Sequence, residues 1–99
     1  MKNFGVYILE SQKNGRYYVG STDDIKRRVN EHNVGKVFST RKMRPWTIRV
    51  FITCDSLTEA RFSEYRLKKY KRRDILSKVI KDKTFPWNHT DVKIVHMRD

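Results

Sequence analysis

Near its start the sequence reads FGVYIL at residues 4–9 and RYYV at residues 16–19, and these two stretches decide the fold. Both are rich in the β-branched and aromatic residues that favour strands. Asn14-Gly15 lies between them and tolerates the positive φ angles of a two-residue type I′ turn. The pattern therefore predicts a β-hairpin in which Lys13 pairs with Arg16.

The two faces of this hairpin differ in composition. With that turn, the numbers of paired residues add up to 29, so odd positions of the first strand share a face with even positions of the second. Tyr7 and Tyr18 then lie on one face, where we expect them to present their phenols to solvent. The opposite face, which has the composition of a core, holds Val6, Ile8 and Val19.

The rest of the chain predicts three helices and a further strand. Residues 21–24 (STDD) supply N-cap oxygens and first-turn carboxylates, and residues 56–59 (SLTE) have the form of a capping box. A weaker strand pattern occurs at residues 92–96. The order β-β-α-β-α-α predicts an α+β domain. The helices are expected at about 21–33, 56–70 and 74–81, and the strand at 47–54.

Length and cysteine content restrict the class of protein. The chain has 99 residues, which suits one domain and leaves no room for a second core. A single cysteine, Cys54, excludes an internal disulfide framework and a Cys-rich zinc site, and we expect a reducing, cytoplasmic location. The first apolar stretch ends at Glu10, far short of the ~20 residues of a membrane span, so we expect neither a secreted nor a membrane-spanning form.

The charge of the chain indicates a polyanionic partner. Lys and Arg number 23 against 11 Asp and Glu, which gives a net charge of +12 and a pI near 10.1. A nucleic-acid-binding domain has this composition, and a membrane-surface or ribosome-associated protein shares it. Hydrophobic residues make up 37% of the chain, too many for a disordered basic tail, so the chain is expected to fold.

Two segments carry much of the positive charge. Residues 34–46 form a basic loop without acidic residues, and residues 66–73 contain six bases in eight positions. Both are expected to grip a nucleic-acid backbone without reading its sequence, and the second also fits a solvated helix face or a localisation-type patch. The expected nucleic-acid-binding residues are Lys36, Arg41, Lys42, Arg44, Lys68, Lys69, Lys71, Arg72 and Arg73.

Glu64 is an acidic residue on an otherwise apolar helix stripe. Its apolar neighbours on this stripe are Leu57, Ala60 and Leu67. A carboxylate in an apolar seam is costly unless it is paired or binds a cation. Two interpretations stay open: a salt bridge to Arg28 or Lys68, or coordination of a hard divalent cation such as Mg²⁺.

Arg28 and His32 are neighbours on the first predicted helix, four residues apart. A guanidinium suits a phosphate through its forked donors, and an imidazole exchanges a proton near neutral pH. The alternative is an ordinary structural role. Arg28 would then be one of three consecutive solvated bases, and His32 a cap at the helix C-terminus.

These positions together resemble a family pattern. Gly5-Val6-Tyr7 and Tyr18-Val19-Gly20 are similar to the paired GIY and YIG motifs of the GIY-YIG nuclease superfamily. Arg28 lies eight residues beyond the second motif and His32 four residues further on. Glu64 follows on a later helix, as the family pattern requires. The resemblance extends from residue 4 to about residue 80 and is greatest to small stand-alone bacterial members and structure-selective repair nucleases.

The resemblance implies a small three-stranded antiparallel sheet with flanking helices. Residues 1–82 would form the nuclease domain, and residues 83–99 a C-terminal extension without an assigned role. The implied activity is that of a divalent-metal-dependent DNA endonuclease acting on structured or damaged DNA in repair or recombination. One Mg²⁺ or Mn²⁺ ion would be held by Glu64. The implied catalytic residues, expected to converge on one face, are Tyr7, Tyr18, Arg28, His32 and Glu64.

Hydrolysis of a phosphodiester needs an activated water and stabilisation of the charge that develops on the phosphate. Tyr7 is expected to orient or deprotonate the water, with its pKa lowered by neighbouring cations. Arg28 would stabilise the transition state, and Tyr18 would hold the phosphate or the water in line. His32 would orient Tyr7 or shuttle its proton, and these two residues could exchange roles.

Two positions depart from the family pattern. Ser21 stands where the excision-repair nuclease domain has a lysine, and Leu76 where some members have an asparagine. Two other functions stay open: a catalytically silent nucleic-acid-binding module, and a basic protein bound to ribosomes or RNA. Because 99 residues leave little room for a targeting domain, we expect specificity to come from DNA shape or from a partner protein.

Overall fold

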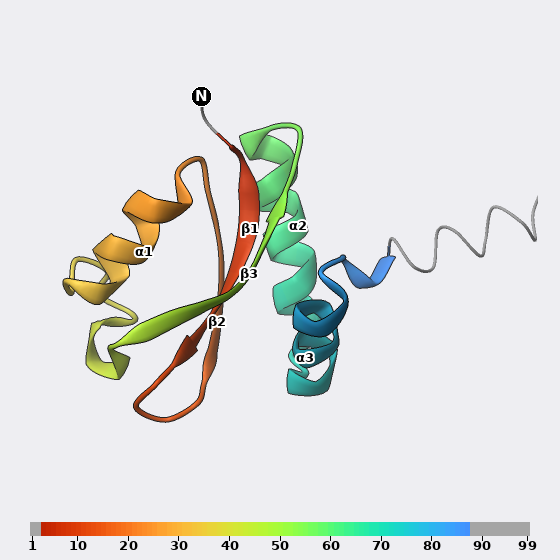
Figure 1. The fold of residues 1–99 in the computed structure, drawn as a ribbon. Helices are drawn as coiled ribbons and strands as arrows, with labels where there is room; N and C mark the ends of the chain where they lie inside the picture. Colours follow the sequence, from red (N-terminus) through yellow and green to blue (C-terminus); the bar gives the residue numbers. More distant parts are fainter. Residues whose placement is uncertain (1–2, 88–99) are drawn as a thin grey trace, which may run out of the picture.

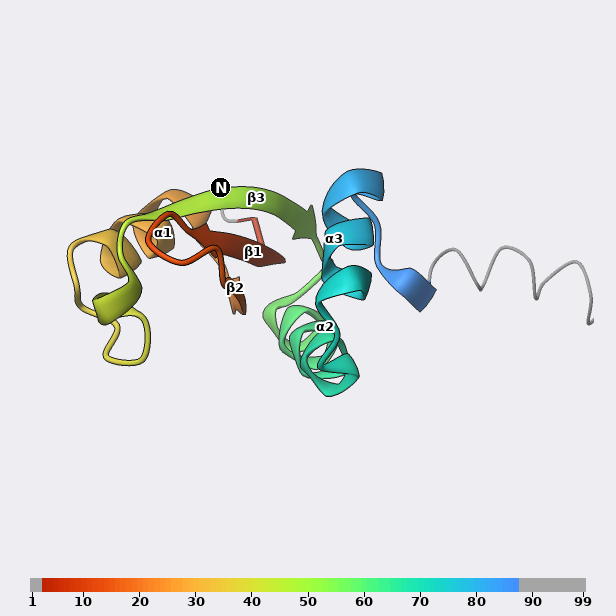
Figure 2. The ribbon, with the colours of Figure 1, turned by 90° about the horizontal axis from the view of Figure 1, so that it is seen from below.

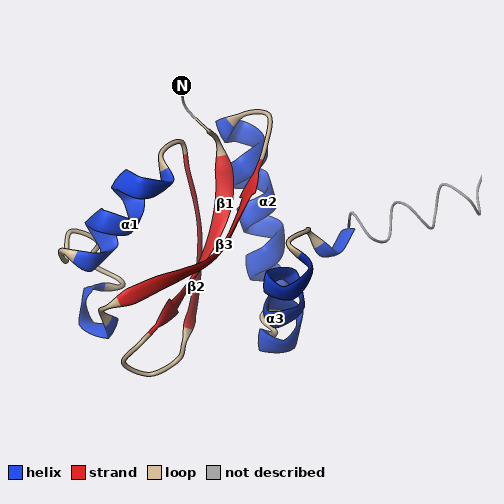
Figure 3. Cartoon of the chain, viewed as in Figure 1, coloured by secondary structure: helices blue, strands red, loops and turns tan. Residues whose placement is uncertain are grey.

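The computed structural model describes residues 3–87 and contains the predicted order of elements, coloured by type in Figure 3. The α+β class is therefore confirmed. The strand pattern at residues 92–96 lies outside the described residues. The strands are β1 (Gly5–Ser11), β2 (Tyr17–Thr22) and β3 (Trp46–Thr53), the helices are α1 (Ile25–Asn33), α2 (Leu57–Tyr70) and α3 (Arg73–Asp82), and a short 3-10 helix, η1 (Arg41–Met43), precedes β3.

The three strands form one antiparallel sheet in the order β2-β1-β3, so β1 is the central strand. Helix α1 lies on one side of the sheet, whereas α2 and α3 lie on the other (Figure 1). Figure 2 shows the same arrangement from below, with the sheet between the two groups of helices. Because both of its faces are covered, β1 is buried along almost its whole length.

The register of the hairpin differs from the prediction. Val6 pairs with Ser21 and Ile8 with Val19, so the numbers of paired residues add up to 27 and not 29. The turn is longer than two residues because the Ser11 hydroxyl accepts hydrogen bonds from two backbone amides within it. Gly15, with a φ of 75°, closes the turn. Both sums are odd, so the predicted sharing of faces is confirmed.

Two hydrophobic cores lie on the two sides of the sheet. The predicted core face packs against α2 and α3, and its buried residues include Val6, Ile8, Val19, Val50, Ala60, Leu67 and Val79. The face of the two tyrosines is a second core, which contains Leu9 and Trp46. The expected presentation of the phenols to solvent is wrong for Tyr7, whereas Tyr18 is half-buried. Tyr7 is only 1% exposed, because α1 and the loop after it cover this face.

Local signals place the helix ends. The Asp24 carboxylate accepts a hydrogen bond from the Arg27 amide at the start of α1, and the Ser56 hydroxyl accepts one from the Glu59 amide at the start of α2. Lys71 adopts a left-handed conformation with a φ of 52° and separates α2 from α3. None of the helices in residues 3–87 is long and apolar enough to cross a lipid bilayer.

The segment after α3 joins the core on the side of α2. Phe85 is buried in that core, and the ring of Trp87 stacks on it with the ring centroids 4.7 Å apart. The Arg66 guanidinium of α2 lies 4.0 Å from the centroid of the Trp87 ring. Residues 85 and 87 therefore tie this segment to the sheet and to α2.

Candidate active site

Tyr7 lies at the centre of the tyrosine face and is held by two partners from α1. Its hydroxyl is 2.9 Å from Nε2 of His32, and Nε of Arg28 donates to it at 3.3 Å. Arg28 also pairs with Glu31 at 3.0 Å. Arg28 is therefore half-buried and held by Tyr7 and Glu31, in place of the fully solvated base of the structural alternative, and the ring of His32 is fully buried against Tyr7 and does not cap the helix end.

The hydrogen bonds around His32 assign its tautomer. The Nδ1 atom lies 2.8 Å from the hydroxyl of Thr40, and that hydroxyl donates to the carbonyl of Val37 at 3.4 Å. Nε of Arg28 can only donate to the oxygen of Tyr7, so the Tyr7 hydroxyl directs its own proton at Nε2 of His32, its other partner. We therefore assign the imidazole proton to Nδ1, where it points at the Thr40 oxygen.

Burial controls the pKa values of this network. It lowers the pKa of His32 to about 4, with a further contribution from the charge of Arg28, so the imidazole is neutral at pH 7. Burial also raises the pKa of Tyr7 to about 12, because the hydrogen bond and the charge of Arg28 only partly offset desolvation. The expectation that neighbouring cations bring the pKa of Tyr7 below its ordinary value is therefore wrong, because the net shift is upward.

Both motif glycines make room for neighbouring groups. A Cβ atom on Gly20 would lie 2.3 Å from the hydroxyl oxygen of Tyr7 and 2.4 Å from its Cζ atom. A Cβ atom on Gly5 would lie 2.5 Å from the carbonyl oxygen of Ile52. Because Gly20 of the second motif has no side chain, it leaves the space that the ring of Tyr7 of the first motif fills.

Glu64 approaches the free edge of β2 from helix α2. The hydroxyl of Ser21 donates to one carboxylate oxygen at 2.5 Å, and Nζ of Lys68 contacts the other at 2.5 Å. The predicted salt bridge to Lys68 is confirmed, whereas Arg28 pairs with Glu31 instead. The contact between Ser21 and Glu64 was not predicted from the sequence. The one sequence feature that marked this position was the serine in place of the lysine of the excision-repair domain.

Tyr18 completes the group of predicted residues. Its ring centroid lies 5.0 Å from that of His32 and 6.3 Å from that of Tyr7. Nζ of Lys68 lies 5.6 Å from the centre of the Tyr18 ring, which links α2 to the tyrosine face. Within residues 3–87, the Tyr18 hydroxyl has no hydrogen-bond partner, so it is available to a ligand.

A polar pocket of about 340 Å³ adjoins these groups, and its lining includes Ser21 and Arg28. Arg27 and Arg61 also line it, together with Asp23, which pairs with Arg27 at 3.1 Å. Ser21 connects the pocket to the Glu64 carboxylate and Arg28 connects it to the Tyr7 hydroxyl, so a phosphate held by the arginines would lie near both groups. The arrangement is thus suited to phosphodiester chemistry.

Comparison with known proteins supports this assignment. A family model described as the GIY-YIG catalytic domain matches residues 3–78. The chain belongs to the GIY-YIG family. Membership in the GIY-YIG family confirms the resemblance found in the two motifs, the fold and the enzyme class, which is that of an endonuclease.

Relatives of this GIY-YIG protein fall into two groups. A UPF0213 protein of Halobacterium salinarum is 44% identical over 68 residues, which cover 68% of this chain and 87% of that protein. A UPF0213 protein of Halalkalibacterium halodurans is 39% identical over 72 residues, which cover 72% of this chain and 76% of that protein. The structure-specific endonuclease subunit SLX1 of Candida dubliniensis is 48% identical over 56 residues, covering half of this chain but 20% of that protein. No solved structure matches the chain.

Glu64 fits a metal ligand of the kind expected in a GIY-YIG site. Among residues 3–87, no group of three or more His, Cys, Asp and Glu side chains could hold an ion by itself. Mg²⁺ is often bound by only one or two carboxylates, with substrate phosphates and water completing its shell. The Glu64 carboxylate is partly exposed and already contacts a cation, the Lys68 ammonium, so it suits this role.

The nine basic residues that are predicted to bind nucleic acid form two groups in this GIY-YIG domain. One group, in the loop between α1 and β3, contains Lys36, Arg41, Lys42 and Arg44. The other group, where α2 meets α3, contains Lys68, Lys69, Lys71, Arg72 and Arg73. Several of them have partners within the protein. Arg41 lies 4.7 Å from the centre of the Phe38 ring, and Arg72 is paired with Asp74 at 2.6 Å. Contact of these residues with a nucleic acid stays a prediction.

Proposed function

We propose that the protein is a divalent-metal-dependent DNA endonuclease that cuts structured or damaged DNA in repair or recombination. The observation that carries this proposal is the buried network of Tyr7, Arg28 and His32 beside Glu64. The network joins a proton path, a phosphate-binding cation and a carboxylate at one edge of the sheet. The name of the SLX1 relative, a structure-specific endonuclease subunit, supports the choice of substrate and a role for a partner protein.

The direction of the hydrogen bonds supports a proton relay. A water molecule that attacks the phosphorus would give its proton to the oxygen of Tyr7, while the hydroxyl proton of Tyr7 passes to Nε2 of His32. Tyr7 then need not become a stable phenolate, which its pKa of about 12 disfavours. The P–O bond to water forms as the bond to the leaving oxygen breaks, and His32, whose pKa of about 4 disfavours the imidazolium, would hold the proton only transiently before it passes to the leaving oxygen or to solvent.

Other residues would stabilise and orient the phosphate. Arg28 keeps Tyr7 in place through Nε and can direct its remaining N–H groups at the phosphate oxygens. The free hydroxyl of Tyr18 would hold the phosphate or the water in line. Glu64, oriented by Ser21, would hold Mg²⁺ or Mn²⁺ in place of its contact with Lys68. When bound, the ion would neutralise charge on the phosphate and on the leaving oxygen.

A nicking assay tests this function. Purified protein would be incubated with branched, flapped and plain duplex DNA, with Mg²⁺, with Mn²⁺ and with EDTA. We expect nicking of the branched and flapped DNA that requires the metal and is lost in Glu64→Gln. Asp82→Asn, which removes a carboxylate at the distant end of α3, is the matched control and should nick normally. DNA binding without metal-dependent nicking would instead favour a catalytically silent binding module.

A further inference from the structure

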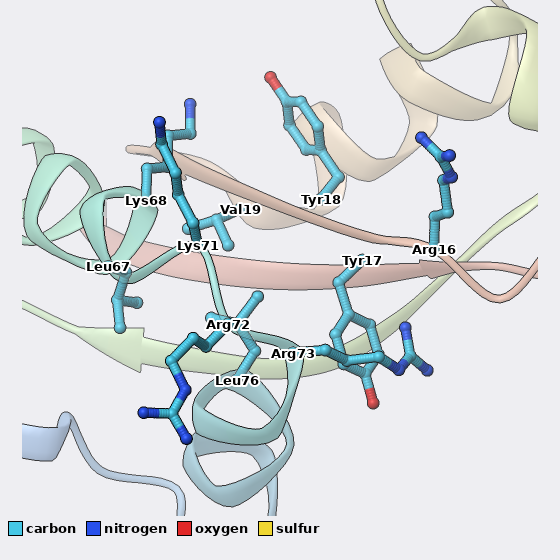
Figure 4. Close-up of a pocket in the computed structure, with 10 residues that line it drawn as sticks. All are labelled: Arg16, Tyr17, Tyr18, Val19, Leu67, Lys68, Lys71, Arg72, Arg73 and Leu76. Atoms are coloured by element: carbon cyan, nitrogen blue, oxygen red, sulfur yellow. The ribbon is translucent and has the colours of Figure 1, made fainter.

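A second pocket, of about 370 Å³, lies beside the free edge of β2 (Figure 4). Strand β2 forms one wall, and the end of α2 with the start of α3 forms the other. Its volume is at the lower end of the range for small-molecule sites, which is about 300–1,000 Å³. The lining residues that matter below are Arg16, Tyr17, Val19, Leu67, Lys71 and Leu76.

The pocket combines an apolar floor with a basic rim, which is formed by Arg16, Lys68, Lys71, Arg72 and Arg73. Three aliphatic side chains, Val19, Leu67 and Leu76, form the floor, and the exposed lining is mainly apolar. Aromatic side chains beside cations are the combination with which proteins bind unpaired nucleotides, and the Tyr17 ring supplies the aromatic part here.

Some cations of the rim are occupied and others are free. Arg73 lies 4.0 Å from the centre of the Tyr17 ring and donates to the Gly15 carbonyl at 2.7 Å, which fixes both side chains as a platform. Arg16 and Lys71 form no ion pair or hydrogen bond through their side chains within residues 3–87. The pocket thus offers a rigid platform and two uncommitted positive charges.

The pocket is continuous with the candidate active site. Lys68 contacts the Glu64 carboxylate at 2.5 Å and also lines the pocket. Lys71 is two turns beyond Glu64, about 10 Å along the helix axis. Tyr18, which also lines the pocket, lies against His32. A strand whose phosphate meets Glu64 and that runs toward the end of α2 would reach the pocket within about three nucleotides, since phosphates repeat about every 3.4 Å along one strand.

We propose that this pocket receives an unpaired nucleotide of the cut strand, next to the phosphate that is hydrolysed. The base would lie on the apolar floor and against the Tyr17 ring, and its phosphate would contact Lys71 and Arg16. A paired base cannot enter, because its neighbours cover its faces and its partner holds its edge. This inference rests on the proposed function and gives it a source of selectivity for flaps and junctions over plain duplex.

The test compares two flap substrates that differ by one base. One carries a normal unpaired nucleotide beside the junction, and the other carries an abasic site there, which keeps the phosphate but removes the base. Affinities are measured by fluorescence anisotropy in EDTA, so no cleavage occurs. We expect the wild-type protein to bind the intact flap about tenfold more tightly than the abasic flap, because the abasic site removes the contacts of the base with the pocket.

Variants distinguish the contribution of the base to DNA affinity from that of the phosphate. Leu76→Ala and Tyr17→Leu should lose the preference for the intact flap, and either one suffices if the other fails to fold. Lys71→Gln should weaken binding of both flaps alike. Lys81→Gln, an exposed lysine near the far end of α3, is the charge-matched control and should change neither affinity.

Equal affinity of the wild-type protein for the two flaps would overturn the inference, because the cations would then only grip the backbone. The two proposals fail in different ways. Metal-dependent nicking without base discrimination would refute the pocket alone. Base discrimination without nicking under any metal would refute the nuclease proposal and support the nucleotide pocket.

Discussion

Replacing Gly20 by alanine would place a methyl group where the phenol of Tyr7 now lies. The added Cβ atom would be 2.3 Å from the hydroxyl oxygen and 2.4 Å from Cζ, so Tyr7 must move. Overpacking of a core by one methyl group costs about 1–3 kcal/mol. Loss of one of the two hydrogen bonds of Tyr7 adds about 1 kcal/mol. We therefore expect Gly20→Ala to lower the free energy of unfolding by about 2–4 kcal/mol.

Thermal and chemical denaturation followed by circular dichroism would measure this loss. For a domain of this size it corresponds to a decrease in Tm of about 10–25 °C. Gly15→Ala is the matched control, because Gly15 has a φ of 75° but only one atom lies near its added Cβ, at 3.9 Å. It should cost only about 1 kcal/mol through backbone strain and leave nicking unchanged.

A double-mutant cycle identifies the cause. If Tyr7 is the group that alanine displaces, Gly20→Ala should cost at least about 1 kcal/mol less in a Tyr7→Leu background than in the wild type. The steric argument would be refuted by additive effects, or by a Gly20→Ala variant that is as stable and as active as Gly15→Ala.

Three other predictions follow from the site and the pocket. First, because the pKa of His32 is lowered to about 4 from an ordinary value of 6.5, the unfolded chain binds a proton at higher pH than the folded chain. The free energy of unfolding should fall as the pH decreases from about 6.5 to 4, and chemical denaturation should show a smaller fall in His32→Gln. Second, Thr40→Val removes the partner of Nδ1 and should slow nicking about tenfold to a hundredfold. Anisotropy should show DNA affinity kept within about twofold, and an unchanged nicking rate would contradict the tautomer assignment. Third, Lys71→Gln should reduce the slope of log affinity against log salt concentration by about one; an unchanged slope would show that Lys71 does not meet a phosphate.

The signals that predicted the fold correctly are local. Oxygen-bearing side chains at residues 21–24 and 56–59 mark two helix starts, and in the structure Asp24 and Ser56 accept the expected amide hydrogen bonds. The sharing of strand faces followed from the parity of the hairpin alone. The register itself was predicted incorrectly, because the hydroxyl of Ser11 stabilises a longer turn than the Asn-Gly pair indicates.

The environment of the tyrosine face could not be predicted in the same way. Whether a strand face is exposed depends on what packs on it, and α1 with the following loop covers Tyr7 only in the folded chain. Burial then sets the pKa values of Tyr7 and His32. From the sequence we expected the pKa of Tyr7 to be lowered, whereas the structure raises it.

The sequence by itself determined the family and the order of the elements, because motif spacing and capping depend on neighbours along the chain, and the assignment of the site residues from the motifs stays a prediction. Only the tertiary structure decided how those residues are connected. His32 bonds to Tyr7 across 25 positions of the chain, and Ser21 bonds to Glu64 across 43 positions. Hydrogen bonds of this kind join groups that are distant in sequence, and their existence depends on the packing of α1 and α2 against opposite faces of one sheet.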